Sequence, residues 1–438
     1  MHLLIKETFT VKRVYTECLL ALCLTAWLPL CGQQPPQATE LPADPFFIKS
    51  TWMIGGTGPW DYLTMDPTAE RLYITHGRTV QVVDVKTGTV AGQITGLHEA
   101  HAVVLDANGQ FGYVSDGPAN AVKVFDPRTL EIVATIPTGP MPRALVMDVQ
   151  SGLLFAICTD PIVVGQQPAA GQHNPARPAD PRAITTSISV IDVTARRRLG
   201  EILMPGKLGF AQSDGNGQLF VLLVDRNQVA RLDASAIAAL LHAQPEGAAS
   251  SPAPVSDGDS SSTGVGSANS AKDGPAPTIL DWTRQLQQNA MSLFRLGSAC
   301  RDPLSLAVDG AHQRIFAACN NMKLMVMNAG SGEVVTSLPI GPGADAVGFD
   351  AERGLIFTAN GDAQGTLTII HQDVTDTYAE VQNLATRRRA RTLAVNTDTG
   401  QVYLVTDYVG VDLAHLGGIG GLRSAPVDGS FQVLVIGH

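Results

Sequence analysis

The sequence predicts an all-β fold: a seven-bladed β-propeller of four-stranded blades, closed by the N-terminal strand joining the last blade. Apolar and polar residues alternate over short runs through most of the chain, as they do in half-buried strands. An Asp or Asn recurs with a Tyr or Phe seven residues after it. These pairs return at intervals of roughly forty residues, the length of one four-stranded blade.

The repeat is anchored by the acid or amide and its aromatic partner. A turn such as the one that starts at Asp106 separates the two and is suited to joining antiparallel strands. A seventh copy, Ser213 and Phe220, keeps the spacing and lacks the acid. The other copies are Asp66/Tyr73, Asp106/Tyr113, Asp148/Phe155, Asp309/Phe316, Asp350/Phe357 and Asn396/Tyr403.

Further strands complete each unit. A strand of small apolar residues precedes the acid, an alternating strand such as 80–84 follows the aromatic residue, and a fourth strand ends most copies near a Gly. The C-terminal strand 431–436 is the third of blade seven. We therefore expect segment 46–54 to supply the fourth strand and remove an exposed edge. A solenoid would need capping units, which we do not find in the sequence.

The N-terminal residues 1–31 have the pattern of a signal peptide. Lys12 and Arg13 precede the apolar run 18–30, which is too short to span a bilayer. Cys31 stands where a bacterial lipoprotein carries its lipidated cysteine, but Leu30 is bulkier than the residue such signals favour. Lipidation and ordinary cleavage both stay open. Export to the periplasm or cell envelope is the expected localisation, with residues 32–45 as a linker and 46–438 as the propeller.

Three segments interrupt the repeat. Residues 234–289 form an insertion within blade four, between its third and fourth strands. Within it, 245–278 is rich in Ser, Ala, Gly, Pro and Asp and is predicted to be disordered, whereas 233–244 favours a short helix. Residues 160–186 and 408–429 are predicted loops between the second and third strands of blades three and seven.

Charge and motifs exclude several function classes. The formal net charge is −10, which makes nucleic acid an unlikely partner. The chain lacks a Gly-x-Ser-x-Gly elbow, a Gly-x-Gly-x-x-Gly loop after a strand and a Cys-x-x-Cys-His haem site. No organic cofactor is expected, and we expect a monomer.

Candidate binding residues lie five positions before the acid of each repeat, where the inner strand should meet the mouth of the central channel. Polar or charged side chains there would suit a small anionic or polyvalent ligand, although solvated residues lining a water-filled channel are the alternative. These positions hold Asp61, His101, Arg143, Leu208, Leu304, Asp345 and Arg391. The candidate ligand-binding residues are Asp61, His101, Arg143, Asp345 and Arg391.

A metal ion is a second possibility at the same face. His76, His98 and His101 with Asp61 offer imidazole and carboxylate ligands of the kind that zinc prefers. The helical His-Glu-x-x-His motif is absent, so ordinary loop histidines are the alternative.

Two arginine runs stand out. Residues 387–389, with Arg391, are expected on the channel side, and 196–198 on the opposite face. The first run could receive a phosphate, a carboxylate or single-stranded nucleic acid, with Tyr408 and Trp60 as nearby stacking candidates.

The repeat resembles that of the YVTN-repeat β-propellers, and the YncE-like proteins are the most similar group. The resemblance rests on the Asp-to-aromatic spacing, on strands ending like 188–192, and on stretches 60–66, 73–77, 365–371, 391–395 and 429–437. It extends over nearly all of 46–438 and implies an exported propeller, without implying a reaction. The insertion and the weak fourth repeat depart from the pattern.

The resemblance also implies a disulfide between Cys300 and Cys319. Strand pairing alone puts Cys319 opposite about Leu304, so the loop at Cys300 would have to fold back to bring the sulfurs together. Two free thiols are the alternative. Cys158 is expected to be a spare, semi-buried thiol.

The leading hypothesis is a non-catalytic exported propeller that binds a protein or small-molecule partner at its channel face. The partner would be an envelope protein or a small molecule, with membrane contact only through a lipid anchor. The alternative is a metal-dependent hydrolase or lactonase that uses the propeller channel.

Overall fold

The computed structural model describes residues 44–438 apart from 57, 163–183, 243–284, 286–287, 374–375 and 412–423. The chain divides into the units 1–39 and 40–438, and all described residues belong to the second. The predicted signal peptide 1–31, Cys31, most of the linker 32–45 and the low-complexity stretch 245–278 therefore lie outside the described residues.

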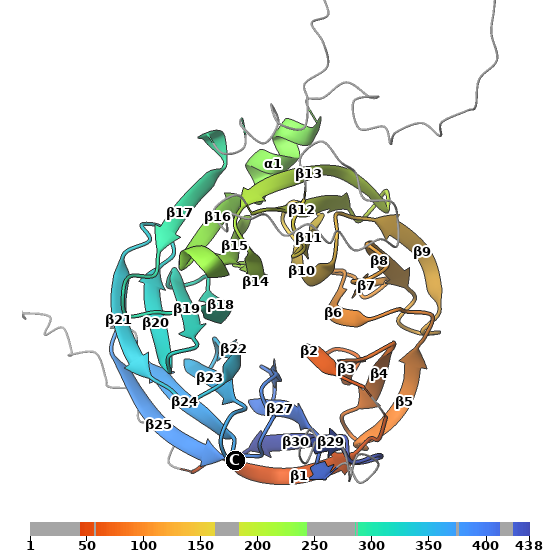
Figure 1. Ribbon diagram of the computed structural model, residues 1–438, viewed down its shortest axis with the longest axis vertical. Helices are drawn as coiled ribbons and strands as arrows, with labels where there is room; N and C mark the ends of the chain where they lie inside the picture. The colour runs from red at the N-terminus through yellow and green to blue at the C-terminus, as the bar shows by residue number, and fades with distance from the viewer. Residues whose placement is uncertain are drawn as a thin grey trace, which may run out of the picture. The chain divides into compact units, whose positions relative to one another are not determined.

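The described strands form seven four-stranded antiparallel sheets arranged as the blades of a ring, which confirms the predicted fold (Figure 1). Blade one contains β2 (Trp60–Asp66), β3 (Arg71–His76), β4 (Thr79–Asp84) and β5 (Thr89–Ile94), from the channel outwards. Blade two contains β6 (Ala100–Leu105), β7 (Gly112–Asp116), β8 (Ala121–Phe125) and β9 (Ile132–Pro137). Blade three contains β10 (Pro142–Asp148), β11 (Leu153–Cys158), β12 (Thr185–Asp192) and β13 (Arg197–Pro205).

The second half of the ring repeats this order. Blade four contains β14 (Leu208–Ser213), β15 (Gln218–Leu223), β16 (Gln228–Asp233) and β17 (Met291–Arg295). Blade five contains β18 (Pro303–Asp309), β19 (Arg314–Cys319), β20 (Lys323–Asn328) and β21 (Val334–Pro339). Blade six contains β22 (Ala344–Asp350), β23 (Leu355–Asn360), β24 (Thr366–Gln372) and β25 (Tyr378–Ala385). Blade seven contains β26 (Leu393–Asn396), β27 (Gln401–Thr406), β30 (Gln432–Gly437) and β1 (Phe47–Met53).

The N-terminal strand closes the ring as predicted. β1 pairs antiparallel with β30, with Trp52 opposite Val433. The Phe46 amide donates a hydrogen bond to Gln382 Oε1 (2.9 Å), and Gln382 Nε2 donates one to the Phe46 carbonyl (3.0 Å). Because Gln382 belongs to β25 of blade six, these bonds attach the first strand to both of the last two blades.

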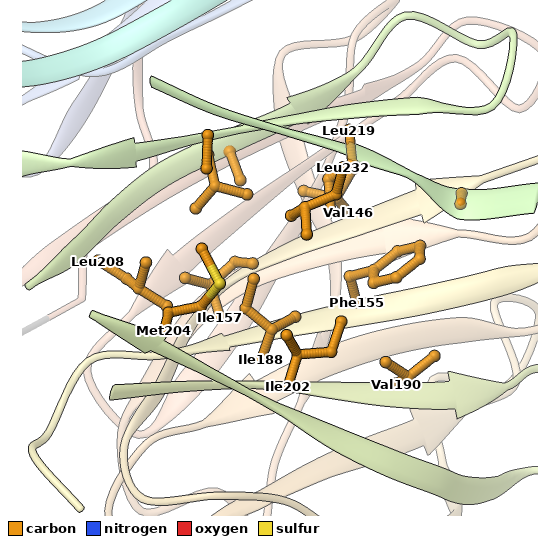
Figure 2. Packing of buried hydrophobic residues seen from close by; sticks show 14 of the residues in the cluster. Val146, Phe155, Ile157, Ile188, Val190, Ile202, Met204, Leu208, Leu219 and Leu232 are labelled. Atoms are coloured by element: carbon orange, nitrogen blue, oxygen red, sulfur yellow. The ribbon is translucent and has the colours of Figure 1, made fainter. Parts of the chain in front are cut away.

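The repeated residues have distinct structural roles. The acid ends the inner strand and accepts bonds from the following turn, as Asp106 Oδ1 does from the Gln110 amide (2.8 Å). The aromatic residue is buried between sheets, where the Tyr73 and Phe125 ring centroids lie 5.9 Å apart. Both faces of the second strand of a blade, such as β11 and β23, are buried, since each blade packs on two neighbours. Figure 2 shows one such core, where Phe155 and residues of the neighbouring blade pack together.

Blade four corrects the predicted register. Asp214 Oδ1 accepts the turn bonds from the Asn216 (2.8 Å) and Gln218 (3.0 Å) amides, and Ser213 Oγ accepts the one from the Gly215 amide (3.0 Å). The turn is one residue shorter than in blade two, which shifts the acid relative to Phe220. Leu208 consequently pairs with Leu223 and is only 1% exposed. The prediction that Leu208 lies at the channel mouth is therefore wrong. Gly209, which directly follows the Leu208/Leu223 pair, occupies that position instead.

A short helix follows β16, as predicted. Helix α1 (Ala234–His242) begins after Asp233, whose Oδ1 accepts a hydrogen bond from the Ala236 amide (2.8 Å). Ile237 is buried against the core between blades three and four. Blade seven also carries a two-stranded hairpin of β28 (Val409–Val411) and β29 (Ser424–Pro426), within the segment predicted as a loop. None of the described helices has the length and apolar character needed to cross a membrane.

Candidate functional site

A break in strand pairing places the candidate residues at the ends of the inner strands. The register shifts across Asp61, His101, Arg143, Leu304 and Asp345. Such a bulge leaves the residue out of the ladder and turns its side chain away from the regular alternation. Arg391 lies two residues before β26 and occupies the corresponding place in blade seven.

Four of the five candidate residues form two pairs. His101 Nδ1 lies 3.0 Å from Asp61 Oδ2, and the His101 side chain is 2% exposed. Arg391 Nε lies 3.3 Å from Asp345 Oδ2, with both side chains partly exposed. Arg143 is exposed. These residues come from blades six, seven, one, two and three, which are consecutive around the ring.

Four of these charged residues act electrostatically on the Tyr62 hydroxyl. Its pKa is raised well above the usual value, first by burial and then by the Asp61 and Asp345 carboxylates, while the Arg143 and Arg391 guanidiniums lower it. Burial likewise raises the pKa of Asp345, and the two arginines oppose that effect. The electrostatic effects of two cations and two anions of the predicted ring therefore overlap at Tyr62.

An aromatic pair lies directly beyond the charged ring. The ring centroids of Tyr62 in β2 and Phe210 in β14 are 5.1 Å apart, although these strands belong to blades one and four. The two rings therefore meet across the channel. Further along the same strands is a cavity of about 440 Å³, lined mainly by apolar side chains such as Val103 and Leu145.

Sequence reasoning did not identify Tyr62 and Phe210 as site residues. Each directly follows the residue at the mouth of its own strand, Asp61 or Gly209. Bulky aromatic residues next to the mouth position were the available signal.

The predicted three-imidazole metal site is not assembled. His76 is buried with Nδ1 3.0 Å from Gln81 Oε1, and His98 Nδ1 lies 3.1 Å from Asp116 Oδ2. His101 pairs instead with the carboxylate at the channel mouth. Each imidazole is held by a different partner, and the described part of the chain has no group of three His, Cys, Asp or Glu side chains placed to hold a metal ion.

The three cysteines that the structure describes divide into a bonded pair and a free thiol. Cys300 and Cys319 form a disulfide with a Cα–Cα distance of 5.4 Å. Cys319 pairs with Pro303, one residue from the expected partner, and the loop before β18 folds back. Cys158 is fully buried rather than semi-buried, and burial raises its pKa to about 12, which keeps the thiol protonated.

The arginine run 387–389 contacts both predicted aromatic residues. The Arg389 guanidinium lies 4.7 Å from the centroid of the Trp60 ring, and that of Arg387 lies 5.1 Å from the centroid of the Tyr408 ring. In the run 196–198, Arg196 ends the turn after β12, and Arg197 and Arg198 begin β13. The Arg196 guanidinium is 4.8 Å from the Phe111 ring.

Comparisons with known proteins identify the fold and no family. No protein-family model and no curated protein matches the chain. A solved structure of U3-55K is similar with a TM-score of 0.57 at 8% identity, covering 87% of this chain and 97% of that one. The WD40 repeats of RRP9 match equally well, with a TM-score of 0.57, 8% identity, and 88% and 96% coverage. A chain of a Mitotic Checkpoint Complex matches with a TM-score of 0.55, 13% identity, and 87% and 96% coverage. These likenesses support the seven-bladed, WD40-like propeller.

Proposed function

We propose that the chain is a non-catalytic binding scaffold whose channel mouth holds a charged small molecule or a charged segment of a protein partner. The supporting observation is the set of charged side chains at the inner-strand ends, where Asp345 pairs with Arg391, Asp61 pairs with His101, and Arg143 is exposed. Guanidiniums bind carboxylates or phosphates through paired hydrogen bonds, and the carboxylates can accept bonds from an ammonium group. A ligand that carries both signs of charge fits this set best.

The aromatic pair favours binding at the mouth over passage through the channel. Tyr62 and Phe210 meet across the channel beyond the charged ring, so a ligand at the mouth would rest on a partly apolar floor. Charged walls over an apolar floor are typical of small-molecule sites. The similar structures add modest support for a protein partner, because one of them belongs to the Mitotic Checkpoint Complex.

We further propose that the scaffold works in an oxidising compartment outside the cytosol. The apolar run after Lys12 and Arg13 supports export. The disulfide between Cys300 and Cys319 supports the same compartment, because such bonds are rare in reducing cytosol.

A thermal-shift screen tests the binding proposal. The full chain is screened against amino acids, short charged peptides, carboxylates, phosphates and amines. We expect compounds with both signs of charge to raise the unfolding temperature of the wild type, since a ligand that binds only the folded state stabilises it. The shift should disappear in Arg143→Gln/Arg391→Gln.

The control variant is Arg196→Gln/Arg197→Gln, which removes the same charge where the turn after β12 leads into β13 and should keep the shift. No stabilising compound, or equal shifts in all three proteins, would overturn the proposal.

A further inference from the structure

We propose a second binding site in a hollow beside blade seven, where an acidic peptide segment of a protein partner docks. Its carboxylates would face the arginine run, and its aliphatic side chains would cover neighbouring apolar residues. The hollow has a volume of about 490 Å³. It is lined by Gln364, Thr386, Arg387, Arg388, Arg389, Asp407, Tyr408 and Val409.

The arginines belong to a fixed loop between β25 and β26. The Arg389 amide donates to the Gly361 carbonyl (2.7 Å), and the Thr386 amide donates to the Gly365 carbonyl (3.0 Å). Gly365 has a φ of +80°, and a Cβ there would collide with the Arg387 carbonyl oxygen. The loop is therefore ordered before binding, and little conformational entropy is lost when a partner arrives.

The hollow has an excess of positive charge. Arg389 Nη1 lies 3.0 Å from Oδ1 of Asp407, whose side chain is 5% exposed. Arg387 hydrogen-bonds to the Tyr408 hydroxyl, and this contact lowers the pKa of Tyr408. No carboxylate among the described residues pairs with Arg387 or Arg388, so two guanidinium charges stay uncompensated in a chain of net charge −10. This positively charged patch on an otherwise acidic chain favours an anionic partner.

Exposed apolar residues beside the arginines favour a peptide over other anions. Tyr408 is 47% exposed, Val409 38% and Val427 47%. The Val427 amide donates to the Tyr408 carbonyl (2.8 Å), which holds these side chains in one patch. Inorganic phosphate would satisfy the guanidiniums and leave the valines in water. Single-stranded nucleic acid needs aromatic platforms for its bases, and the ring of Tyr408 already carries Arg387.

A random-peptide display library selected against the immobilised full chain tests the site. We expect the recovered peptides to be enriched in Asp and Glu next to aliphatic residues. A recovered peptide should bind Arg387→Ser/Arg388→Ser roughly tenfold or more weakly, because each lost guanidinium removes a charge-assisted hydrogen bond. Arg196→Ser/Arg197→Ser, with the same change of charge where the turn after β12 leads into β13, should bind the peptide like the wild type.

Further variants in the same binding experiment distinguish this site from the channel mouth. The two sites share no lining side chain. The Arg143→Gln variant should bind the selected peptide as tightly as the wild type does. No acidic enrichment, undiminished binding by Arg387→Ser/Arg388→Ser, or loss confined to Arg143→Gln would overturn the inference, and the last result would leave the channel-mouth proposal standing. Displacement of the peptide by an oligo-dT strand at lower concentration than by free peptide would also overturn it in favour of nucleic acid.

Discussion

The channel mouth has a charged arc and an apolar arc built on the same fold. Blades four and five place Gly209 and Leu304 at the position that other blades fill with titratable side chains. The charged arc consists of Asp345, Arg391, Asp61, His101 and Arg143, from blades six, seven, one, two and three. In both arcs these positions lie at the channel end of the inner strands, although the register shifts there in blades one to six and Arg391 of blade seven precedes β26. The fold therefore does not require charge at this position, and its confinement to consecutive blades points to binding.

The largest expected effect is the loss of stability when a core aromatic residue is replaced in either arc. It tests whether the blades of the two arcs are packed in the same way. Phe316 in blade five and Phe357 in blade six are both fully buried at the same place in the repeat. Phe316→Ala and Phe357→Ala should each lower the free energy of unfolding by about 3–5 kcal/mol, through lost burial and the cavity left behind. Denaturant titration would measure both losses. A severe loss in one variant and a negligible loss in the other would show that the arcs are not structurally equivalent.

The disulfide distinguishes the apolar arc, since it links the entry of blade five to its second strand. Cys300→Ser/Cys319→Ser should lose about 2–4 kcal/mol of stability, because the bond restricts a loop of the unfolded chain. Treatment of the wild type with a reductant should give the same loss. If the double variant and the oxidised wild type unfolded at the same denaturant concentration, the bond would have no stabilising role.

Alanine substitutions at two glycines compare two effects: strain of the backbone alone, and loss of the contact that supports the arginine loop. Gly365→Ala should destabilise the chain by about 1–3 kcal/mol and abolish peptide binding, since the added Cβ meets the Arg387 carbonyl. Gly429 has a φ of +72° with nothing within 4 Å of its would-be Cβ, so Gly429→Ala incurs the strain alone. Calorimetry and peptide titration on both variants provide the comparison, and equal behaviour would contradict the support role.

The smallest effect is a pH dependence confined to the charged arc. Burial raises the pKa of Asp345 in the folded protein, so the wild type loses stability as pH rises from the usual carboxyl value of about 4 through the folded one. Asp345→Asn should therefore be slightly more stable than the wild type at neutral pH and no more stable below that window. Leu304→Asn, in the apolar arc, should show a difference that does not vary with pH. Thermal unfolding measured across this pH range tests the prediction. If the Arg391 charge outweighed burial and lowered the pKa of Asp345, the wild type would instead gain stability as pH rises.

The sequence was sufficient for the repeated parts of the fold. The spacing from Asp106 to Tyr113 and its copies predicts the blade number, and the unpaired third strand at the C-terminus predicts ring closure by β1. These features are local, because an acid at a turn and an aromatic residue in the next strand act within one blade.

The remaining features depend on contacts between distant residues or on small register changes. A turn shortened by one residue moved the acid of blade four from the expected position to Asp214, which misplaced Leu208. The meeting of Tyr62 and Phe210 joins blades that are not neighbours, so no repeat could reveal it. In the sequence, His76 and His98 cannot be told apart from metal-binding histidines in loops. Only the folded chain shows that each is paired with a different side chain, Gln81 or Asp116.

Photocrosslinking from the two arcs would test the central claim most directly. A photoreactive phenylalanine analogue is placed at Glu99, beside His101 in the charged arc, or at Arg301, beside Leu304 in the apolar arc, in cells that produce the chain. We expect an adduct from position 99 that is lost when Arg143→Gln/Arg391→Gln is added, and no adduct from position 301. Adducts from position 301 alone, or from neither position, would contradict binding at the charged arc.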